Sequence, residues 1–543
     1  MKIERAYFLP LLLVGAVALP ANRAIADGAD AYIGAVRTFA DSVLKYGKDV
    51  YGPRHTPLFV DGLNVDTREP VKWKRKGEVW TLSNQATQQV LFRTLDGLTK
   101  LTGEPKYREA ATAAIRYAFD NLCSPNGLFY WGGHWCYDAA TEKQVGEAYR
   151  HELKCNYPYY DLMWEVDPKA TRQFIKAFWN AHILDWSNLD MNRHGSYTKE
   201  MGNLWASTYK GGKVFFVGKG LTFVNTGSDL FYAAAMLHKF TDEQEPLVWA
   251  KRMAHRYVET RNRKTGLGGY QYSRVARDRA QEQFGPDFGD RILEGTILEP
   301  HRARTKNAIA GICQLKLGET LGDAGKDFLQ WALEDLTAYG RHAYKAENNT
   351  FLPMISDGTI LTGFVMKRDG YYGEKGSTFE PAPADTLFFW AYALAYRLSG
   401  DKFMWEMARS IGRGNDLGDI GASPGDAARL NIATRCSDPQ AIFGLLDLYK
   451  NTGDKSYLKL AQRVGDNVLN NRLHNGFFVP SKEHLFARFD SVEALALLHL
   501  AATIRGKPDI VPGYYAEYAK FHCPYDGIGR TYDTVAIYDR RRK

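Results

Sequence analysis

Three short segments between residues 130 and 200 contain side chains whose types and spacing suit a metal site. They are Tyr130-Trp131-Gly132-Gly133-His134, His151-Glu152-Leu153-Lys154 and Arg193-His194-Gly195. Two imidazoles and one carboxylate, from His134, Glu152 and His194, suit a divalent transition metal such as Mn, Co, Ni or Zn and leave coordination positions open. Taken separately, each is more simply a structural histidine or a solvated charge. The prediction therefore requires the fold to bring the three together.

The elements that must position these side chains are mostly helices. Few segments alternate as strands do, and apolar residues recur at helical spacing, for example at Val90, Leu91, Leu95, Leu98 and Leu101. We expect the segment that begins at His151 to open a helical stretch running towards Trp164. The stretch at 57–65 is the best short β-region.

A turn signature recurs along the chain. Gly103, Gly400 and Gly453 are each followed by an acidic residue and, eight positions after the glycine, by an alanine. A glycine just past a helix supplies a positive-φ cap, the acidic residue favours the start of the next helix, and the alanine lets neighbouring helices approach closely. Each copy predicts the turn inside a helical hairpin. The 53-residue spacing from Gly400 to Gly453, and again to Gly506, predicts stacked or ring-closed hairpins.

Long polar, aromatic-rich insertions separate the hairpins. They lie at 124–160, 185–228, 263–304 and 344–382. Such insertions suit a closed ring of helices whose loops build one cleft, whereas an open solenoid would show more regular copies. No linker divides the chain. We therefore predict an all-α fold, an (α/α) barrel, with residues 27–543 as a single catalytic domain.

The N-terminus has the features of a secretory signal peptide. Lys2 and Arg5 precede an apolar stretch, and the small-residue site Ala24-Ile25-Ala26 predicts cleavage before Asp27. Removing these 26 residues from 543 leaves 517, and export places the protein in the periplasm or outside the cell. Six cysteines are too few to staple a fold of this size, and disulfides and buried free thiols both remain open.

The charge balance indicates the kind of partner. Cleavage would take the formal net charge from +8 to +6, a mild excess that suits an anionic polymer. No later run of 18 apolar residues is present, so we predict no membrane span. This excess does not identify the partner, and the oligomeric state is left open.

The chain resembles a known family in five segments. They are TPLFVDGLNVDTREPVKW at 56–73, YWGGH at 130–134, HELK at 151–154, PYYDL at 158–162 and NRHG at 192–195. These segments are similar to the family-two polysaccharide lyases, the metal-dependent pectate and polygalacturonate lyases. The resemblance implies a barrel of seven hairpins and β-elimination of galacturonan, giving 4,5-unsaturated oligogalacturonides. The partner that it implies is therefore polygalacturonate or a related acidic polysaccharide, with no nucleic acid. The resemblance also implies that His134, Glu152 and His194 hold a metal of the manganese type and that Arg193 is the catalytic base.

The chemistry of uronan cleavage explains these residue types. The proton on C5 lies α to a carboxylate, and a cation bound there neutralises charge that develops in the transition state. An arginine base is unusual because guanidinium is normally protonated, although a nearby dication disfavours the protonated form. Arg193 could instead clamp the substrate carboxylate with a two-point fork. Both roles stay open at this stage.

Sugar binding needs aromatic faces and basic side chains along a groove. Loop stretches 270–274 and 367–375 have this mixture, and we nominate Tyr272, Arg274 and Lys375 as substrate contacts. Two other functions remain open: a helical-barrel glycoside hydrolase acting on uronides, for which the Asp-rich loop 61–66 offers carboxylates, and a non-catalytic protein that binds acidic polysaccharide. Export favours internal cutting, since polymer reaches an exported enzyme before small products.

Overall fold

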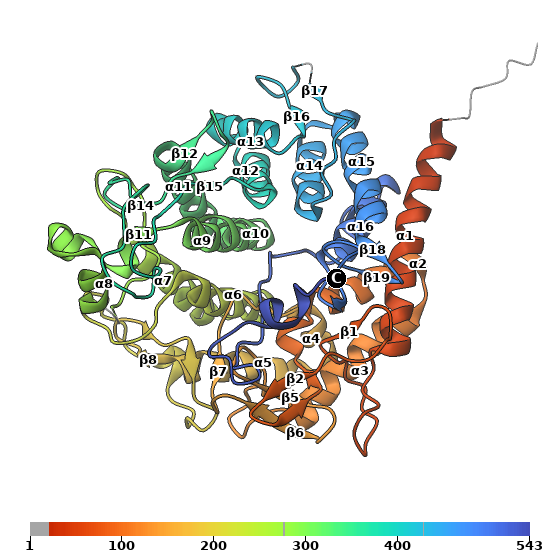
Figure 1. The fold of residues 1–543 in the computed structure, drawn as a ribbon, viewed down its shortest axis with the longest axis horizontal. Helices are drawn as coiled ribbons and strands as arrows, with labels where there is room; N and C mark the ends of the chain where they lie inside the picture. Colours follow the sequence, from red (N-terminus) through yellow and green to blue (C-terminus); the bar gives the residue numbers. More distant parts are fainter. Residues whose placement is uncertain (1–20, 275–276, 427, 543) are drawn as a thin grey trace, which may run out of the picture.

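Seven pairs of helices form a closed ring in the computed structural model, which describes residues 21–274, 277–426 and 428–542. The inner helices are α2 (Gln89–Thr102), α4 (Tyr160–Val166), α6 (Val224–Thr241), α10 (Gly311–Leu321), α12 (Thr386–Ser399), α14 (Pro439–Thr452) and α16 (Val492–Ile504). Their outer partners, in the same order, are α3 (Pro105–Asn121), α5 (Pro168–His182), α7 (Gln244–Val258), α11 (Lys326–Ala343), α13 (Lys402–Gly414), α15 (Lys455–Arg472) and α1 (Ala21–Tyr46). Figure 1 shows the ring. The predicted (α/α) barrel is confirmed.

Burial explains which helices line the inside. Helices α6, α12 and α16 are apolar around most of their circumference and almost wholly buried, as a helix enclosed by neighbours must be. Helices α3, α13 and α15 bury only one face. The largest hydrophobic cluster contains residues from Ala29 to Ala519.

The predicted hairpin turns are present. Gly103, Gly400 and Gly453 end α2, α12 and α14 with φ of 77°, 68° and 70°, and an outer helix begins two residues later. The alanines eight positions after each glycine are fully buried against neighbouring helices. At Gly506 the repeat ends differently: the described residues 507–542 contain no outer helix, and α1 pairs with α16 instead.

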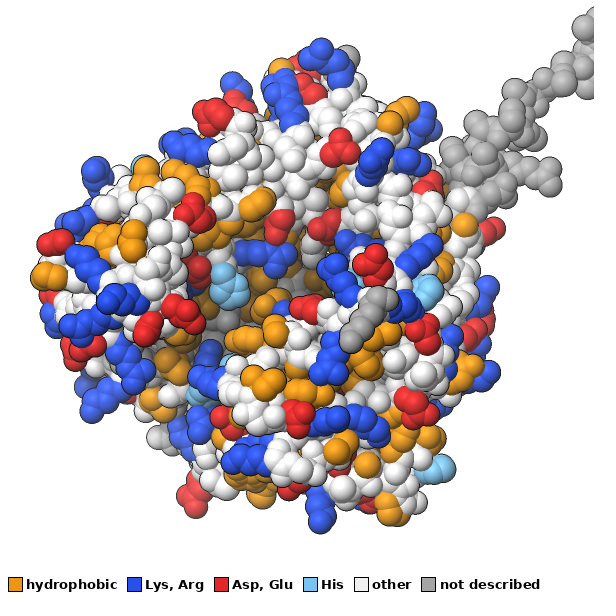
Figure 2. Space-filling model, in the orientation of Figure 1, with side chains coloured by type: hydrophobic (Ala, Val, Ile, Leu, Met, Phe, Trp, Pro, Cys, Tyr) orange, Lys and Arg blue, Asp and Glu red, His pale blue; other side chains and the backbone are white. Residues whose placement is uncertain are grey.

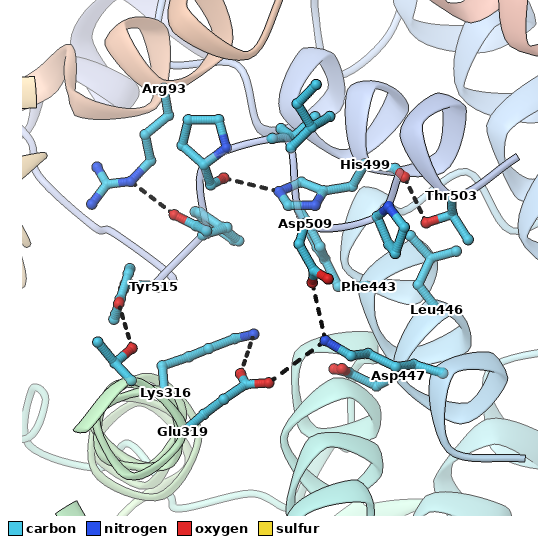
Figure 3. Close-up of a pocket in the computed structure, with 18 of the residues that line it drawn as sticks. Arg93, Lys316, Glu319, Phe443, Leu446, Asp447, His499, Thr503, Asp509 and Tyr515 are labelled. Carbon is cyan, nitrogen blue, oxygen red and sulfur yellow. Dashed lines mark hydrogen bonds and ion pairs between the residues drawn. The ribbon is translucent and has the colours of Figure 1, made fainter. Parts of the chain in front are cut away.

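The chain after α16 runs through the ring. Tyr514 stacks on Trp390 of α12, with ring centroids 5.4 Å apart, and Tyr515 packs on Tyr232 of α6 at 4.8 Å. Arg93 of α2 forms a buried ion pair with Glu517, Nη1 to Oε1 2.6 Å. Because these contacts come from different sides of the ring, the segment 511–517 lies inside it (Figures 1 and 3).

A cavity of about 520 Å³ lies beside this segment at the end of the barrel where the short hairpin turns are. Lys316 and Lys450 both pair with Glu319 there, and Lys450 also contacts Asp509 (Figure 3). Its charged side chains thus largely neutralise one another.

The long insertions contain short strands and small helices. The strands are β1 (Gly62–Asn64), β2 (Trp73–Arg75), β3 (Glu78–Trp80), β4 (Leu82–Ser83), β5 (Trp135–Asp138), β6 (Lys143–Gly146), β7 (His151–Glu152), β8 (Ile183–Asp185), β9 (Asp190–Met191), β10 (His194–Gly195), β11 (Ile297–Leu298), β12 (Tyr344–Lys345), β13 (Thr350–Phe351), β14 (Met354–Ile355), β15 (Ala382–Pro383), β16 (Gly418–Asp419), β17 (Arg429–Leu430), β18 (Leu473–His474), β19 (Phe477–Phe478) and β20 (Phe486–Arg488). Helices α8 (Arg277–Phe284) and α9 (Pro300–Ala303) lie in the insertion between α7 and α10. β1 falls within the expected β-region.

The expectation of a helix starting at His151 is wrong. His151 and Glu152 form strand β7, and the helix towards Trp164 begins only at Tyr160. Four residues carry too little periodicity to distinguish helix from strand, and pairing with β10 decides the conformation.

Three further expectations concern the signal peptide, the cysteines and a membrane span. Residues 1–20 of the predicted signal peptide lie outside the described residues, and α1 begins at Ala21. All six cysteines are free thiols. No helix in the described part of the chain is long and apolar enough to cross a membrane.

Candidate metal centre

Strand pairing brings the predicted ligands together. β7 and β10 are antiparallel, with Glu152 opposite His194 and His151 opposite Gly195. Glu152 Oε1 lies 3.6 Å from His134 Nε2, 3.7 Å from His194 Nε2 and 3.6 Å from Arg193 Nε. The other three residues selected from the sequence therefore surround one carboxylate oxygen of Glu152.

The glycines of the Tyr130–His134 segment leave room for that carboxylate. A Cβ placed on Gly133 would lie 1.5 Å from Glu152 Oε2, far inside van der Waals contact. Gly132 has φ of 119°, a backbone conformation that residues other than glycine rarely adopt. Asn84 holds this backbone from behind, donating from Nδ2 to Gly132 O at 2.8 Å. The two glycines thus let the loop that carries His134 pack directly on Glu152.

The ligand atoms of His134 and Glu152 make no hydrogen bonds with the described residues; their charged neighbours Glu147, Arg193 and Lys154 lie 3.3, 3.6 and 3.7 Å away. Both ring nitrogens of His134 and both carboxylate oxygens of Glu152 are buried without a hydrogen bond among the described residues. Burying a carboxylate in this way is costly unless a cation compensates it. Two ligand atoms that are each about 2.1 Å from one ion lie roughly 3 to 3.5 Å apart, close to the separations seen here. The residues therefore fit a divalent transition metal.

The protonation states also suit metal binding. Burial would raise the pKa of Glu152, but Lys154, His194 and Arg193 outweigh it and hold that pKa well below its usual value. Burial lowers the pKa of His134 to about 4 and lowers that of His194. At neutral pH the site thus presents a carboxylate and neutral imidazoles, the forms that ligate metals.

A chain of hydrogen bonds between buried histidines supports the strand pair. Trp131 Nε1 donates to His151 Nε2 at 2.5 Å, so His151 Nδ1 carries the proton and donates to His182 Nε2 at 2.8 Å. His182 Nδ1 then donates to Asn192 O at 2.8 Å. Asn192 in turn accepts at Oδ1 from the backbone N–H of His194. This chain ties α5 to the loop that carries Arg193 and His194.

The sequence analysis assigned no role to His182, His522 or Lys154. Lys154 Nζ lies 3.7 Å from Glu152 Oε2, and its ammonium stands over the Tyr532 ring at 4.5 Å. The His522 ring lies 5.3 Å from that of His134. His522 comes from the C-terminal segment, where no motif or periodicity marks it. The signal that Lys154 offered was its place in the HELK segment, two residues after Glu152.

The nominated sugar contacts lie elsewhere. Tyr272 is 1% exposed, packs on Tyr257 and donates its hydroxyl to the Leu189 carbonyl, so its ring has no face free for a sugar. Arg274 lies beside Asp278, with Nη2 3.7 Å from Oδ1, and Lys375 is exposed on a loop. Within the described residues, neither side chain has a hydrogen bond or ion pair with the Glu152 cluster.

A different aromatic and basic group contains part of the nominated 367–375 loop. Arg302 of α9 lies 4.3 Å from the Tyr372 ring centroid and 4.7 Å from that of Tyr371, which is 69% exposed. Arg302 also pairs with Glu299 at 3.2 Å and Glu294 at 3.7 Å. The face shown in Figure 2 is hollowed inside the ring, and Lys, Arg, Asp and Glu side chains lie at the hollow.

The fold and the site define an (α/α) barrel with a buried cluster of imidazoles and a carboxylate. The family described as periplasmic pectate lyase matches residues 56–524. A pectate disaccharide-lyase of Dickeya dadantii is 30% identical over 545 residues, which cover 94% of this chain and 97% of that protein. The chain therefore belongs to the periplasmic pectate lyase family, and the prediction of a polysaccharide lyase is confirmed.

Solved structures with lower similarity were also found. A cellobiose 2-epimerase from Bacillus thermoamylovorans has a TM-score of 0.45 at 10% identity, covering 87% of this chain and 100% of its own. A GH76 α-mannanase from Bacteroides thetaiotaomicron has a TM-score of 0.43 at 10% identity, covering 88% of this chain and 96% of its own.

Proposed function

We propose that this chain is a metal-assisted pectate lyase that cleaves polygalacturonate by β-elimination and yields 4,5-unsaturated oligogalacturonides. The observation that carries the proposal is the convergence of His134, His194 and Arg193 on the buried carboxylate of Glu152, in a chain of the pectate lyase family. Manganese is the proposed metal, with Co, Ni and Zn as substitutes, because imidazole and carboxylate ligands suit all four.

The metal, when bound, neutralises the uronate carboxylate and so eases loss of the adjacent C5 proton. His134, Glu152 and His194 would hold it. Lys154 stays near Glu152 Oε2 and balances the carboxylate charge. Burial of His134 and Glu152 keeps bulk water from their ligand atoms.

Arg193 lies beside the ligand His194 and is the proposed catalytic residue. Its Nε donates to His194 Nε2 at 3.3 Å, and this nitrogen has only one lone pair. When that lone pair is committed to an ion, Arg193 loses its acceptor and its guanidinium is free to act on the uronate. The proposed base is the deprotonated form of Arg193, which would receive the C5 proton, and a clamp on the carboxylate by the protonated guanidinium is the alternative role.

The other functions have less support. A glycoside hydrolase needs two available carboxyl groups, but Asp61 accepts from Thr87 and Tyr538, and Asp66 pairs with Arg542. A protein that only binds polysaccharide has no need for buried ligand atoms without partners. The exposed Tyr371 and the nominated Arg274 and Lys375 are the proposed sugar contacts, and Tyr272 is left out because it is buried.

One assay separates these functions. Purified protein is mixed with polygalacturonate and the ultraviolet absorbance of the conjugated double bond is followed, because only elimination creates that bond. The Dickeya relative is named for a disaccharide product, and we propose an unsaturated disaccharide as the main early product here, in place of internal cutting. Chromatography of early time points tests it, and a broad ladder of oligomers would support internal cutting instead.

Export is part of the proposal. Residues 1–26 are the proposed signal peptide and residues 27–543 the single mature domain, located in the periplasm or outside the cell. The family description as periplasmic supports this location. Mass spectrometry of the protein recovered from the periplasm should give a mature chain beginning at Asp27, and an uncleaved chain would refute the leader.

A further inference from the structure

The C-terminal segment places a third imidazole at the cluster. One ligand atom each from His134, Glu152 and His522 lie within 4.8 Å of one another. The backbone N–H of His522 donates to Gly133 O at 2.5 Å, so the segment is attached to the same loop that carries His134. We propose that His522 is a direct protein ligand of the metal, in addition to the three residues indicated by the sequence. This inference rests on the proposed metal-assisted function.

The orientation of the His522 ring favours ligation. Its side chain is 6% exposed, and Nδ1 is buried without a hydrogen-bond partner among the described residues. Tyr532 stacks on the ring, with centroids 4.1 Å apart and planes at 26°, and fixes its plane. The ring of His134 lies 5.3 Å away. An oriented imidazole with a buried, unpaired nitrogen beside other such groups is suited to coordinate an ion.

Neighbouring histidines show what a structural role looks like in this protein. His151 and His182, directly behind the cluster, use both ring nitrogens in hydrogen bonds. His522 and His134 instead leave buried nitrogens without partners. Because buried polar atoms are normally paired, the unpaired nitrogen of His522 supports a ligand role for this residue.

Two anchors hold the chain just before His522. Five residues earlier, Glu517 forms its buried ion pair with Arg93 inside the ring (Arg93 is labelled in Figure 3). Immediately before His522, the backbone N–H of Phe521 donates to Asp533 Oδ2 at 3.1 Å, and Asp533 N–H donates back to Phe521 O at 3.0 Å. The path through the barrel therefore delivers His522 to a fixed place.

The test measures metal binding directly. Wild type, His522→Ala, His522→Gln and Glu152→Ala are stripped of metal and titrated with Mn²⁺ by calorimetry and with Co²⁺ by visible absorption. The d–d bands of Co²⁺ report the number and type of ligands. His484→Gln is the matched control, since His484 is also a buried C-terminal histidine but bonds to Ser481.

We expect both His522 variants to fold, to bind Mn²⁺ at least ~10- to 100-fold more weakly than wild type, and to shift the Co²⁺ bands. Loss of a residue that only hydrogen-bonds to a metal ligand typically costs this much, and loss of a ligand should cost no less. Circular dichroism checks folding, and the Gln variant keeps most of the side-chain volume. Wild-type affinity and an unchanged Co²⁺ spectrum in a folded His522 variant would overturn this inference alone. If wild type itself bound neither metal, the metal-assisted function would fail instead.

Discussion

Replacing Gly133 with alanine should displace the metal-binding carboxylate of Glu152, although no ligand residue is itself substituted. The new Cβ would lie 1.5 Å from Glu152 Oε2, and ordinary contact needs about 3.4 Å, so the carboxylate must move by roughly 2 Å. Metal sites tolerate errors of only about 0.2 Å in ligand distances. We therefore expect Gly133→Ala to lose at least ~100-fold in Mn²⁺ affinity and in turnover at limiting metal, more than the loss of an outer partner typically costs.

Calorimetric Mn²⁺ titration and the double-bond absorbance assay check this expectation. Gly34→Ala is the control, because a Cβ there meets nothing within 4 Å and alanine favours a helix. Overpacking at Gly133 should also cost about 1–3 kcal/mol of unfolding free energy. Since Glu152→Ala removes the clashing atoms, the double variant Gly133→Ala/Glu152→Ala should recover most of that cost. Wild-type metal affinity in Gly133→Ala, or additive stability losses in the double variant, would refute the steric reasoning.

The remaining predictions concern the base, the metal, pH and salt. Arg193→Lys and Arg193→Ala should each lower turnover by ~10²- to 10⁴-fold with metal content unchanged, and a folded Arg193→Ala enzyme keeping more than about a tenth of turnover would contradict a base role. Exhaustive chelation should abolish activity and Mn²⁺ should restore it; full activity in protein shown to be metal-free by elemental analysis would contradict metal assistance. Burial lowers the pKa of His182 to about 3, whereas its value in the unfolded chain is about 6.5. Between these two values the unfolded state binds more protons, so the free energy of unfolding should fall as the pH drops below about 6.5. The slope from this group is at most about 1.4 kcal/mol per pH unit. Urea unfolding of metal-free protein at several pH values measures that slope, and His182→Gln should flatten it. Michaelis constants should rise with salt, because exposed charges are screened over about 8 Å at physiological ionic strength.

The hairpin turns were predictable because their causes are local. A glycine in the left-handed region can be recognised from a few residues on either side, and Gly103, Gly400 and Gly453 all adopt that conformation. The closing of the ring is not local: α16 pairs with α1, and no feature near Gly506 indicates that the chain will turn inward. Pairing across the whole chain length is decided by packing, which one sequence does not display.

Within the site, predictability followed the chemistry of each residue. His134, Glu152, Arg193 and His194 sit in short motifs whose residue types suggest metal chemistry, and the structure places them around one oxygen. Tyr272 was selected because aromatic and basic residues alternate near it, but that pattern does not distinguish a ring facing a cleft from a ring in the core. Successive side chains of an extended segment point to opposite sides, so a shift of one residue along the chain reverses the side that a tyrosine faces.

His522 lies in a segment with neither helical nor strand periodicity, so no pattern could place it. Its position depends on the ion pair between Glu517 and Arg93 and on the bond from His522 N–H to Gly133 O, which join the end of the chain to α2 and to the His134 loop. These contacts form only when the C-terminal segment lies inside the closed ring. Completion of the metal site and closure of the barrel are therefore linked. Bound metal should stabilise the folded protein by RT ln(1 + [M]/Kd), where [M] is the free metal concentration and Kd is the dissociation constant of the site in the folded protein. A thermal midpoint that rises with Mn²⁺ in wild type, and rises less in His522→Gln, is the expected signature of that link.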